Sequence, residues 1–249
     1  MSGIWDGISA WAQDIKADFI LNFVTENRWK FITTGLSNTI IITFLALIIG
    51  VILGIVIAIV RSSYDKTYAE MRKGFKKFLL WLANKICEIY LTVIRGTPVV
   101  VQLMVMYYII FASSRNSLMV AVLSFGINSG AYVAEIIRSG IMSIDPGQFE
   151  AGRSLGFDYK ATMWYIIIPQ AFKNVLPALA NEFIVLLKET SVAGYVTIRD
   201  LTMGGNIIRA ATYSPFMPLI AVALIYLVMV IVFTKLVNIL ERRLRNNER

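Results

Sequence analysis

Polar and charged side chains occur in two otherwise apolar parts of this chain, 128–135 and 182–191. If these parts lie in a bilayer, a charged side chain at its centre costs about 2.5 to 3.5 kcal/mol, so these groups should face a protein interior. Carboxylates there suit an ammonium group, and hydroxyl, amide and amine donors suit a carboxylate. The acceptor candidates are Glu135, Glu182 and Glu189, and the donor candidates are Asn128, Ser129, Lys188, Thr190 and Ser191.

Intramembrane groups of these types are typical of a polar path through a membrane protein. The alternative is that Lys188 only forms a structural ion pair with a neighbouring Glu. The stretch 190–194 also holds a Gly where a helix could break, and a broken membrane helix offers free backbone groups to a polar solute.

Enzymatic and metal chemistry are not expected. The chain has no histidine, and its one cysteine, Cys87, allows no disulfide within the chain. No nucleophile–base pair or metal-ligand set stands out. There is also no GxxxxGK[ST] phosphate loop, so any ATP and Mg²⁺ must be bound by another polypeptide.

The composition predicts an all-α membrane protein, because 57% of the 249 residues are hydrophobic and only 16% are charged. A span needs about 20 apolar residues. Residues 78–94 carry Lys85 and Glu88 and are expected to form an interfacial or elbow helix. Five predicted spans remain: 39–60, 96–114, 116–134, 177–198 and 210–234.

Lys and Arg gather in three segments, 61–95, 138–174 and the end from 235 onward. Five spans put all three on one face, which the positive-inside rule makes the cytoplasm, with the N-terminus outside and the C-terminus inside. The net charge of +8 therefore reflects topology and does not indicate nucleic-acid binding. Arg95 is expected to anchor the cytoplasmic end of the second span.

The chain divides into an N-terminal extracytoplasmic or interfacial segment (1–35), a transmembrane domain (36–240) and a basic cytoplasmic tail (241–249). The first residues lack the basic start and apolar core of a cleavable signal peptide, so a short retained amphipathic segment is expected. Residues 50–54 (GVILG) are a GxxxG match that permits close helix approach.

The cytoplasmic segment 138–174 has strong helix signals. Asp145 suits an N-cap, Gln148 would complete a capping box, and Gly156 suits a C-terminal stop. The segment predicts a helix of about ten residues, roughly 15 Å long. A second helix, capped by Asp158, should follow and end near Pro169.

The run EAGRSLGFDYKATMWYIIIP (150–169) resembles the cytoplasmic EAA loop of ATP-binding-cassette (ABC) importer permeases, with Gly152 in place of the second Ala. The runs YLTVIRGTPVVVQL (90–103), GAYVAEIIRSGIMSIDPGQFEAGRSLG (130–156) and IIPQAFKNVLPALANEFIVLLKETS (167–191) resemble, in the same order, the branch of that family for polar amino acids. The resemblance covers roughly 30–240.

The resemblance implies a type I ABC importer permease in a bacterial cytoplasmic membrane, without enzymatic activity or a cofactor of its own. It implies three partners: an ABC ATPase subunit, a second permease copy or paralogue, and an extracytoplasmic amino-acid-binding protein. The loop would dock on the ATPase, with charges pairing and apolar residues filling its cleft. The expected coupling residues are Phe149, Glu150, Ala151, Gly152, Arg153, Leu155 and Gly156.

Intramembrane Glu and Lys side chains are also typical of an ion- or proton-coupled secondary amino-acid carrier, which stays open as an alternative. Uptake that persists without the ATPase would favour the carrier. The residues do not identify the amino acid, nor whether the permease pairs with itself or with a relative.

Overall fold

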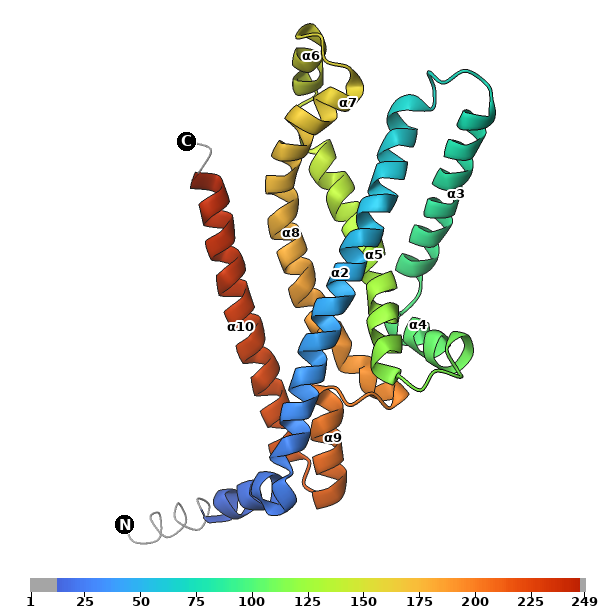
Figure 1. The fold of residues 1–249 in the computed structure, drawn as a ribbon. Helices are drawn as coiled ribbons and strands as arrows, with labels where there is room; N and C mark the ends of the chain where they lie inside the picture. Colours follow the sequence, from blue (N-terminus) through green and yellow to red (C-terminus); the bar gives the residue numbers. More distant parts are fainter. Residues whose placement is uncertain (1–12, 247–249) are drawn as a thin grey trace.

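The computed structural model describes residues 13–246, and no β-strand occurs in that range. Five long helices lie side by side along most of the molecule (Figure 1). They are α2 (Trp29–Thr67), α3 (Phe75–Gly96), α5 (Ser117–Met142), α8 (Ile168–Glu189) and α10 (Phe216–Asn246). The all-α class and the membrane character predicted from composition are confirmed.

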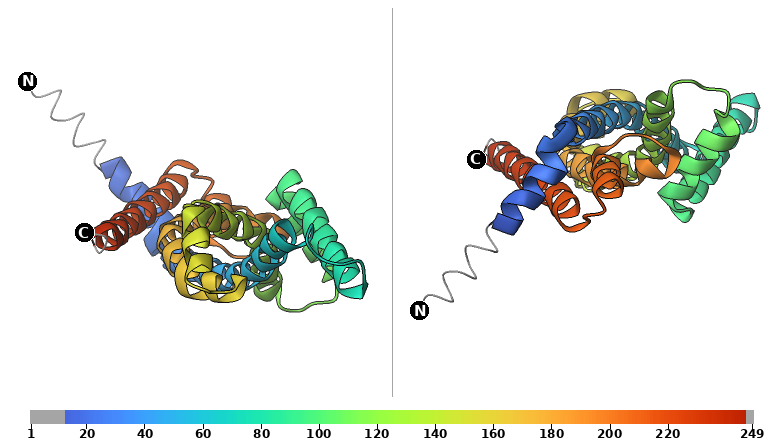
Figure 2. Two further views of the ribbon diagram at one scale, coloured as in Figure 1. Left: turned by 90° about the horizontal axis from the view of Figure 1, so that it is seen from above. Right: turned by 90° about the horizontal axis from the view of Figure 1, so that it is seen from below.

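Short elements connect the long helices. The π-helix η3 (Met106–Ile110) follows α4 (Val99–Val105). The 3₁₀-helix η5 (Thr190–Val196) and α9 (Leu201–Thr212) follow α8. Between α5 and α8 come α6 (Gly147–Ser154), α7 (Tyr159–Thr162) and η4 (Met163–Ile167). Figures 1 and 2 place α6 and α7 at one end of the molecule and α9 at the other.

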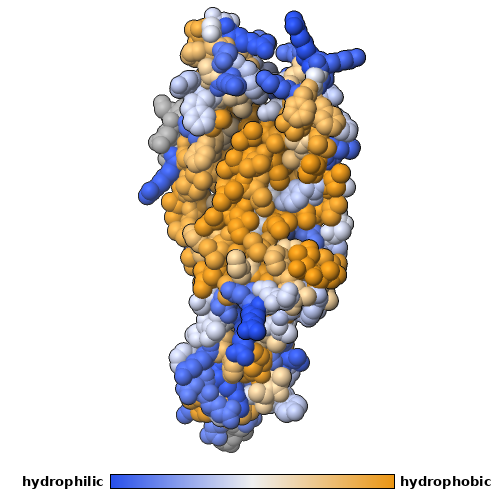
Figure 3. Space-filling model, turned by 45° about the vertical axis from the view of Figure 1, so that its right-hand side comes forward, coloured by the Kyte–Doolittle hydropathy of each residue, from blue (hydrophilic) through white to orange (hydrophobic). Residues whose placement is uncertain are grey.

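The three basic segments reach the same end of the molecule, although α3 extends from that end to the level of the middle of α2 (Figure 1). The α2–α3 connection, the α6–α7 hairpin and the C-terminal end of α10 all lie at the top of Figure 1, whereas the N-terminal segment lies at the bottom. A broad apolar surface separates the two polar ends in Figure 3. The predicted domain boundaries at 35/36 and 240/241 fall inside α2 and α10, so no backbone break marks them.

Within residues 13–246, the helices α2, α5 and α10 are long and apolar enough to cross a membrane, and the bent pair of α3 with the α4–η3 segment could be a fourth span. The prediction of one membrane span over 96–114 is wrong. The chain bends by 111° after Gly96, and residues 78–94 lie inside the 22-residue helix α3. Thr97 is extended because it precedes Pro98, and this breaks the helix.

The GxxxG match in α2 packs against α5 of the same chain. A Cβ added to Gly50 would lie 2.9 Å from Ser129 Oγ, and one added to Gly54 would lie 2.5 Å from Val133 Cγ1. From the other side, a Cβ on Gly126 would lie 2.8 Å from the Ile49 side chain. These glycines let the two backbones approach closely and fix how α5 presents its polar residues.

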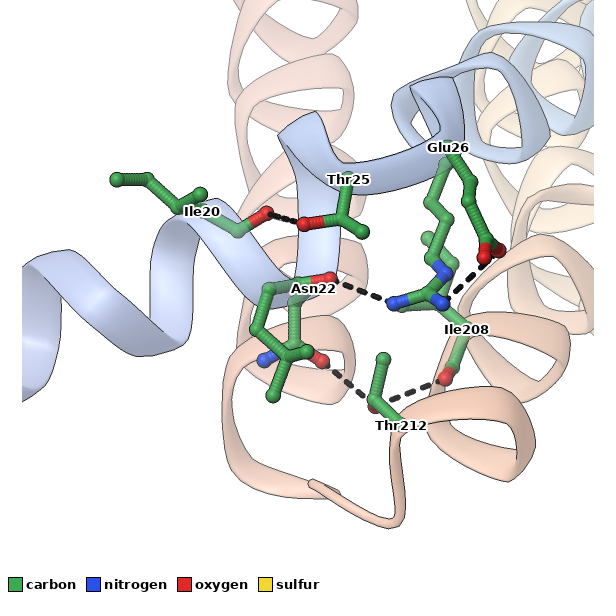
Figure 4. Close-up of polar contacts among 8 residues, drawn as sticks. Ile20, Asn22, Thr25, Glu26, Ile208 and Thr212 are labelled. Carbon is green, nitrogen blue, oxygen red and sulfur yellow. Dashed lines mark hydrogen bonds and ion pairs between the residues drawn. The ribbon is translucent and has the colours of Figure 1, made fainter.

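At the opposite end, the N-terminal segment is tied to the turn after α9 (Figure 4). The buried Asn22 accepts a hydrogen bond from Thr212 Oγ1 at 2.8 Å. Arg28 donates to the Leu21 carbonyl at 2.7 Å and pairs with Glu26 at 3.0 Å. Part of the predicted amphipathic N-terminal segment, 1–12, lies outside the described residues.

Candidate functional site

The α6–α7 hairpin forms where the sequence predicts it. Asp145 Oδ1 accepts from the Gly147 N–H at 2.8 Å, Asp158 Oδ1 accepts from the Ala161 N–H at 2.7 Å, and Gly156 has φ +84° beyond the end of α6. That positive φ favours glycine and stops the helix.

Three details of the predicted hairpin differ. The first helix, α6, has eight residues, and Gln148 forms no capping box but accepts from Gln170 Nε2 at 3.4 Å. The second helix does not end near Pro169, because the chain continues through the π-helix η4 into α8. Pro169 lies in the first turn of α8. Pro169 has no N–H to donate, and the π-helix η4 directly precedes this turn.

Two predicted coupling residues face their own chain. Phe149 is half-buried against Ile144 and Ile167, stacks on Tyr159 with ring centroids 6.3 Å apart, and has Lys66 Nζ 4.6 Å from its ring centroid. Burial also raises the pKa of Tyr159. Phe149 therefore seats the hairpin on the bundle, and the expectation that it fills a partner's cleft does not fit this packing.

Gly152 is likewise buried, facing α7. A Cβ on it would lie 2.7 Å from Thr162 Cγ2 and 2.8 Å from Thr162 Oγ1. The departure from the second Ala of the EAA pattern thus has a local cause, because a methyl group would collide with the short Thr162 side chain.

The remaining predicted coupling residues form the outer surface of the hairpin. Leu155 is 74% exposed. The other exposed members are Glu150, Ala151, Arg153 and Gly156. This surface has an apolar side chain between charges of both signs. It is held in place because Phe149 packs against Ile144 and Ile167, and such a surface can dock on a complementary protein.

The base of the hairpin, where Phe149 packs on the bundle, also contacts α2. Arg138 of α5 forms an ion pair with Asp65 of α2 at 3.1 Å, next to the contact between Lys66 and Phe149. A cavity of about 230 Å³ lies between these groups. Displacement of α6 therefore acts on the ends of both α2 and α5.

Deeper in the bundle, two adjacent residues of α5 each form a hydrogen-bonded pair with another helix, Asn128 with the half-buried Gln102 and Ser129 with Glu182. These four residues are called the buried polar site. Ser129 Oγ donates to Glu182 Oε1 at 2.8 Å, and Asn128 Nδ2 donates to Gln102 Oε1 at 2.9 Å. Asn128 Oδ1 is buried without a hydrogen-bond partner among the described residues. Glu182 is only 8% exposed, and it forms no ion pair with any cation among the described residues. The site thus offers a carboxylate and an amide oxygen to a donor.

The other predicted path residues lie elsewhere. Glu135 forms an ion pair with Arg95 at 3.6 Å. Lys188 is exposed, and within residues 13–246 it has no ion pair, so the structural bridge to a neighbouring Glu does not form. Thr190 is buried and donates to the Leu187 carbonyl at 2.7 Å.

Glu189 and Ser191 are half-buried at the end of α8, where the helix gives way to η5. The break therefore falls where the hydroxyl- and glycine-containing run predicted it. These residues lie on the next two turns after Glu182, and the structure does not bring them into hydrogen bonds with the buried polar site.

Arg95 is also not where the sequence predicted it. It lies at the end of α3 that is remote from the α2–α3 connection, so it does not anchor the cytoplasmic end of a span. Lys66 was outside the predicted site set, because a lysine at this position carries no local signal. Across the described part of the chain, no three Cys, Asp or Glu side chains gather as metal ligands would.

Comparison with known proteins agrees with this geometry. Residues 77–246 match the family described as binding-protein-dependent transport system inner membrane component. The arginine transport system permease protein ArtQ of Bacillus subtilis (strain 168) is 40% identical over 177 residues, which cover 70% of this chain and 78% of that protein. The glutamine transport system permease protein GlnP of Escherichia coli (strain K12) is 38% identical over 170 residues, or 66% and 77%.

Solved structures share the fold. A crystal structure of an amino acid ABC transporter with histidines has 42% sequence identity and a TM-score of 0.77, over 89% of this chain and 98% of that one. The MetNI methionine ABC transporter in an inward-facing conformation has a TM-score of 0.71 over 86% and 96%, but at 15% identity it supports the fold alone.

Proposed function

The chain belongs to the family of binding-protein-dependent transport system inner membrane components, and on that premise we propose that it is the permease subunit of an ATP-driven importer for a polar amino acid. It is a multi-pass inner-membrane transport protein. The relatives named for arginine and glutamine transport support the amino-acid class, and do not favour the self-sufficient carrier.

The exposed outer surface of the α6–α7 hairpin is the observation that carries the coupling role. Glu150, Arg153 and Leu155 are free to contact a separate ATPase, which binds ATP and Mg²⁺. Phe149 and Gly152 act indirectly, by holding the hairpin on the bundle. Because the base of the hairpin is packed and tied to α2 and α5, movement of the hairpin is transmitted as displacement of these helices.

The buried polar site supports a role as the point where the amino acid binds during passage. The Glu182 carboxylate would accept from the substrate ammonium, and Asn128 Oδ1 would accept a further hydrogen bond. Gln102 and Ser129 orient these groups through the hydrogen bonds they already make. Glu189, Thr190, Ser191 and Lys188 remain candidates for the outer part of the path.

A second permease copy or paralogue and an extracytoplasmic binding protein complete the proposed assembly. A tagged chain purified from its native membrane should bring down an ATPase and a solute-binding protein identified by mass spectrometry. In proteoliposomes that complex should take up an amino acid only with ATP inside. Uptake that persists without the ATPase would overturn the proposal.

Glu150→Lys supplies a matched test of the hairpin. It reverses a charge on the exposed surface, and uptake should fall while the permease stays in the membrane. Lys73→Glu, an exposed reversal in the α2–α3 connection, is the control and should leave uptake near wild type.

A further inference from the structure

A charged groove lies beside the buried polar site, and the proposed function does not yet use it. The release groove is defined here by Arg61, Glu88, Thr92, Arg95, Gly96 and Glu135, from helices α2, α3 and α5. Its volume is about 360 Å³. Arg95 Nη1 and Glu135 Oε1 face each other in it at 3.6 Å, too far for a hydrogen bond.

The groove and the buried polar site share one wall. Gln102 Nε2 donates to the Ile94 carbonyl at 2.7 Å and to the Thr97 carbonyl at 3.0 Å. Those two residues flank Arg95 and Gly96, at the bend between α3 and α4. The inner end of the groove is therefore one turn of backbone away from Gln102 and Asn128.

The groove leads from the buried polar site toward the α6–α7 end. On α5, Glu135 lies six residues after Ser129, about 9 Å nearer that end. On α3, Glu88 lies seven residues before Arg95, about 10 Å nearer the α2–α3 connection. Arg61, whose buried Nε donates to no described residue, continues the row toward the same end.

Lipid does not suit this groove. The end of α3 lies level with the middle of α2 in Figure 1, so Arg95 is far from both polar ends of the molecule. The side chains of Arg95 and Glu135 are 47% and 35% exposed, a costly state for charges against hydrocarbon. Hydrophilic groups also interrupt the apolar surface on the α3 side in Figure 3. Charges so placed suit a polar surface better than contact with lipid.

We propose that the release groove is a second amino-acid subsite, through which the substrate leaves the buried polar site for the cytoplasm, and that the Arg95–Glu135 pair is its gate. This proposal rests on the proposed function. An amino acid carries a carboxylate and an ammonium on one carbon. On release the pair opens, the substrate carboxylate pairs with Arg95, and the substrate ammonium pairs with Glu135, so one ion pair is exchanged for two.

Gly96 provides a way to block the groove without disturbing the fold. A Cβ added to Gly96 meets no atom within 4 Å, and the same holds for Gly74 in the α2–α3 connection. Gly96→Trp therefore places a bulky side chain in open space at the inner end of the groove, and Gly74→Trp is the matched control.

The test uses the full importer complex in proteoliposomes, with radiolabelled arginine and glutamine as probes. Gly96→Trp should lower the initial uptake rate of the transported probe at least tenfold, with wild-type yield and melting temperature, while Gly74→Trp stays near wild type. Wild-type uptake by Gly96→Trp would overturn the proposal. Should Gly96→Trp not assemble, Gly96→Cys in a Cys87→Ser background is labelled after assembly with a bulky thiol reagent, and unchanged uptake after labelling would overturn it equally.

A structural ion pair and a gate are separated by replacing both charges with apolar side chains. Arg95→Met with Glu135→Leu should leave the melting temperature unchanged or raised, because such replacements are often neutral or stabilising. If the pair is a gate, uptake nevertheless falls at least tenfold. If uptake is retained, the proposal is wrong. Absence of ATP-dependent uptake by the wild-type complex would instead contradict the proposed function itself.

Discussion

The α6–α7 hairpin and the buried polar site satisfy their polar groups in opposite ways. The hairpin turns Glu150 and Arg153 to the outside and rests on an apolar seat of Phe149, Ile144 and Ile167. The polar site turns its groups inward, where Ser129 and Glu182 satisfy each other. The hairpin thus depends on shape and backbone geometry, whereas the polar site depends on individual hydrogen bonds.

The largest effect is expected at the buried polar site, because a charge-assisted hydrogen bond contributes about 1.5 to 3 kcal/mol and has no substitute there. Glu182→Gln keeps an acceptor for Ser129 but removes the charge that would hold an ammonium. Uptake should fall on the order of 100-fold at most. Initial uptake rates in proteoliposomes measure it, with yield as the folding control. Unchanged uptake by this variant would remove Glu182 from the path.

The next effect tests the backbone geometry of the hairpin. Gly156→Pro is incompatible with φ +84° and removes the N–H that donates to the Arg153 carbonyl at 2.9 Å. Uptake should fall about tenfold or more, at a cost of about 1.4 kcal/mol or more, while ATP hydrolysis loses its dependence on transport. Gly156→Asn, which tolerates a positive φ, should retain most uptake. Wild-type uptake by Gly156→Pro would show that the turn is unimportant.

A smaller effect is expected where the hairpin meets α2. Lys66→Met keeps the apolar stem but removes the charge over the Phe149 ring, a contact of about 0.5 to 1 kcal/mol. The ratio of amino acid transported to ATP hydrolysed should fall two- to fivefold. Lys73→Met, in the exposed α2–α3 connection, is the control. A ratio that stays at the wild-type value in Lys66→Met would mean that α2 is not driven through this contact.

The smallest effect concerns Gly152. Gly152→Ala gains about 1 kcal/mol of helix propensity but forces Thr162 to move, so the two contributions nearly offset each other and uptake should fall about twofold. Adding Thr162→Ala removes the colliding atoms and should restore uptake. A double variant that is worse than Gly152→Ala would show that Thr162 matters for its own hydrogen bond to the Asp158 carbonyl.

Local signals in the sequence determined much of the hairpin. Asp145, Asp158 and Gly156 act within two or three residues of their own positions, so their roles could be predicted from spacing. Long apolar runs likewise identified α2, α5 and α10. Membership of the polar-amino-acid permeases followed from several motifs in order, which no single run would have established.

Only the tertiary structure decided which faces meet. Helical periodicity does not tell which neighbour a helix face contacts. From the sequence, Phe149 and Gly152 could both contact a partner protein, but in the structure they face α2 and α7 of their own chain. Thr97 and Pro98 bend the chain, which moved the second long helix from 96–114 to α3. That bend and the close α2–α5 packing bring Arg95 beside Glu135, and Gln102 beside Asn128. Such pairs depend on helix crossings between distant segments, and spacing along one chain does not contain them.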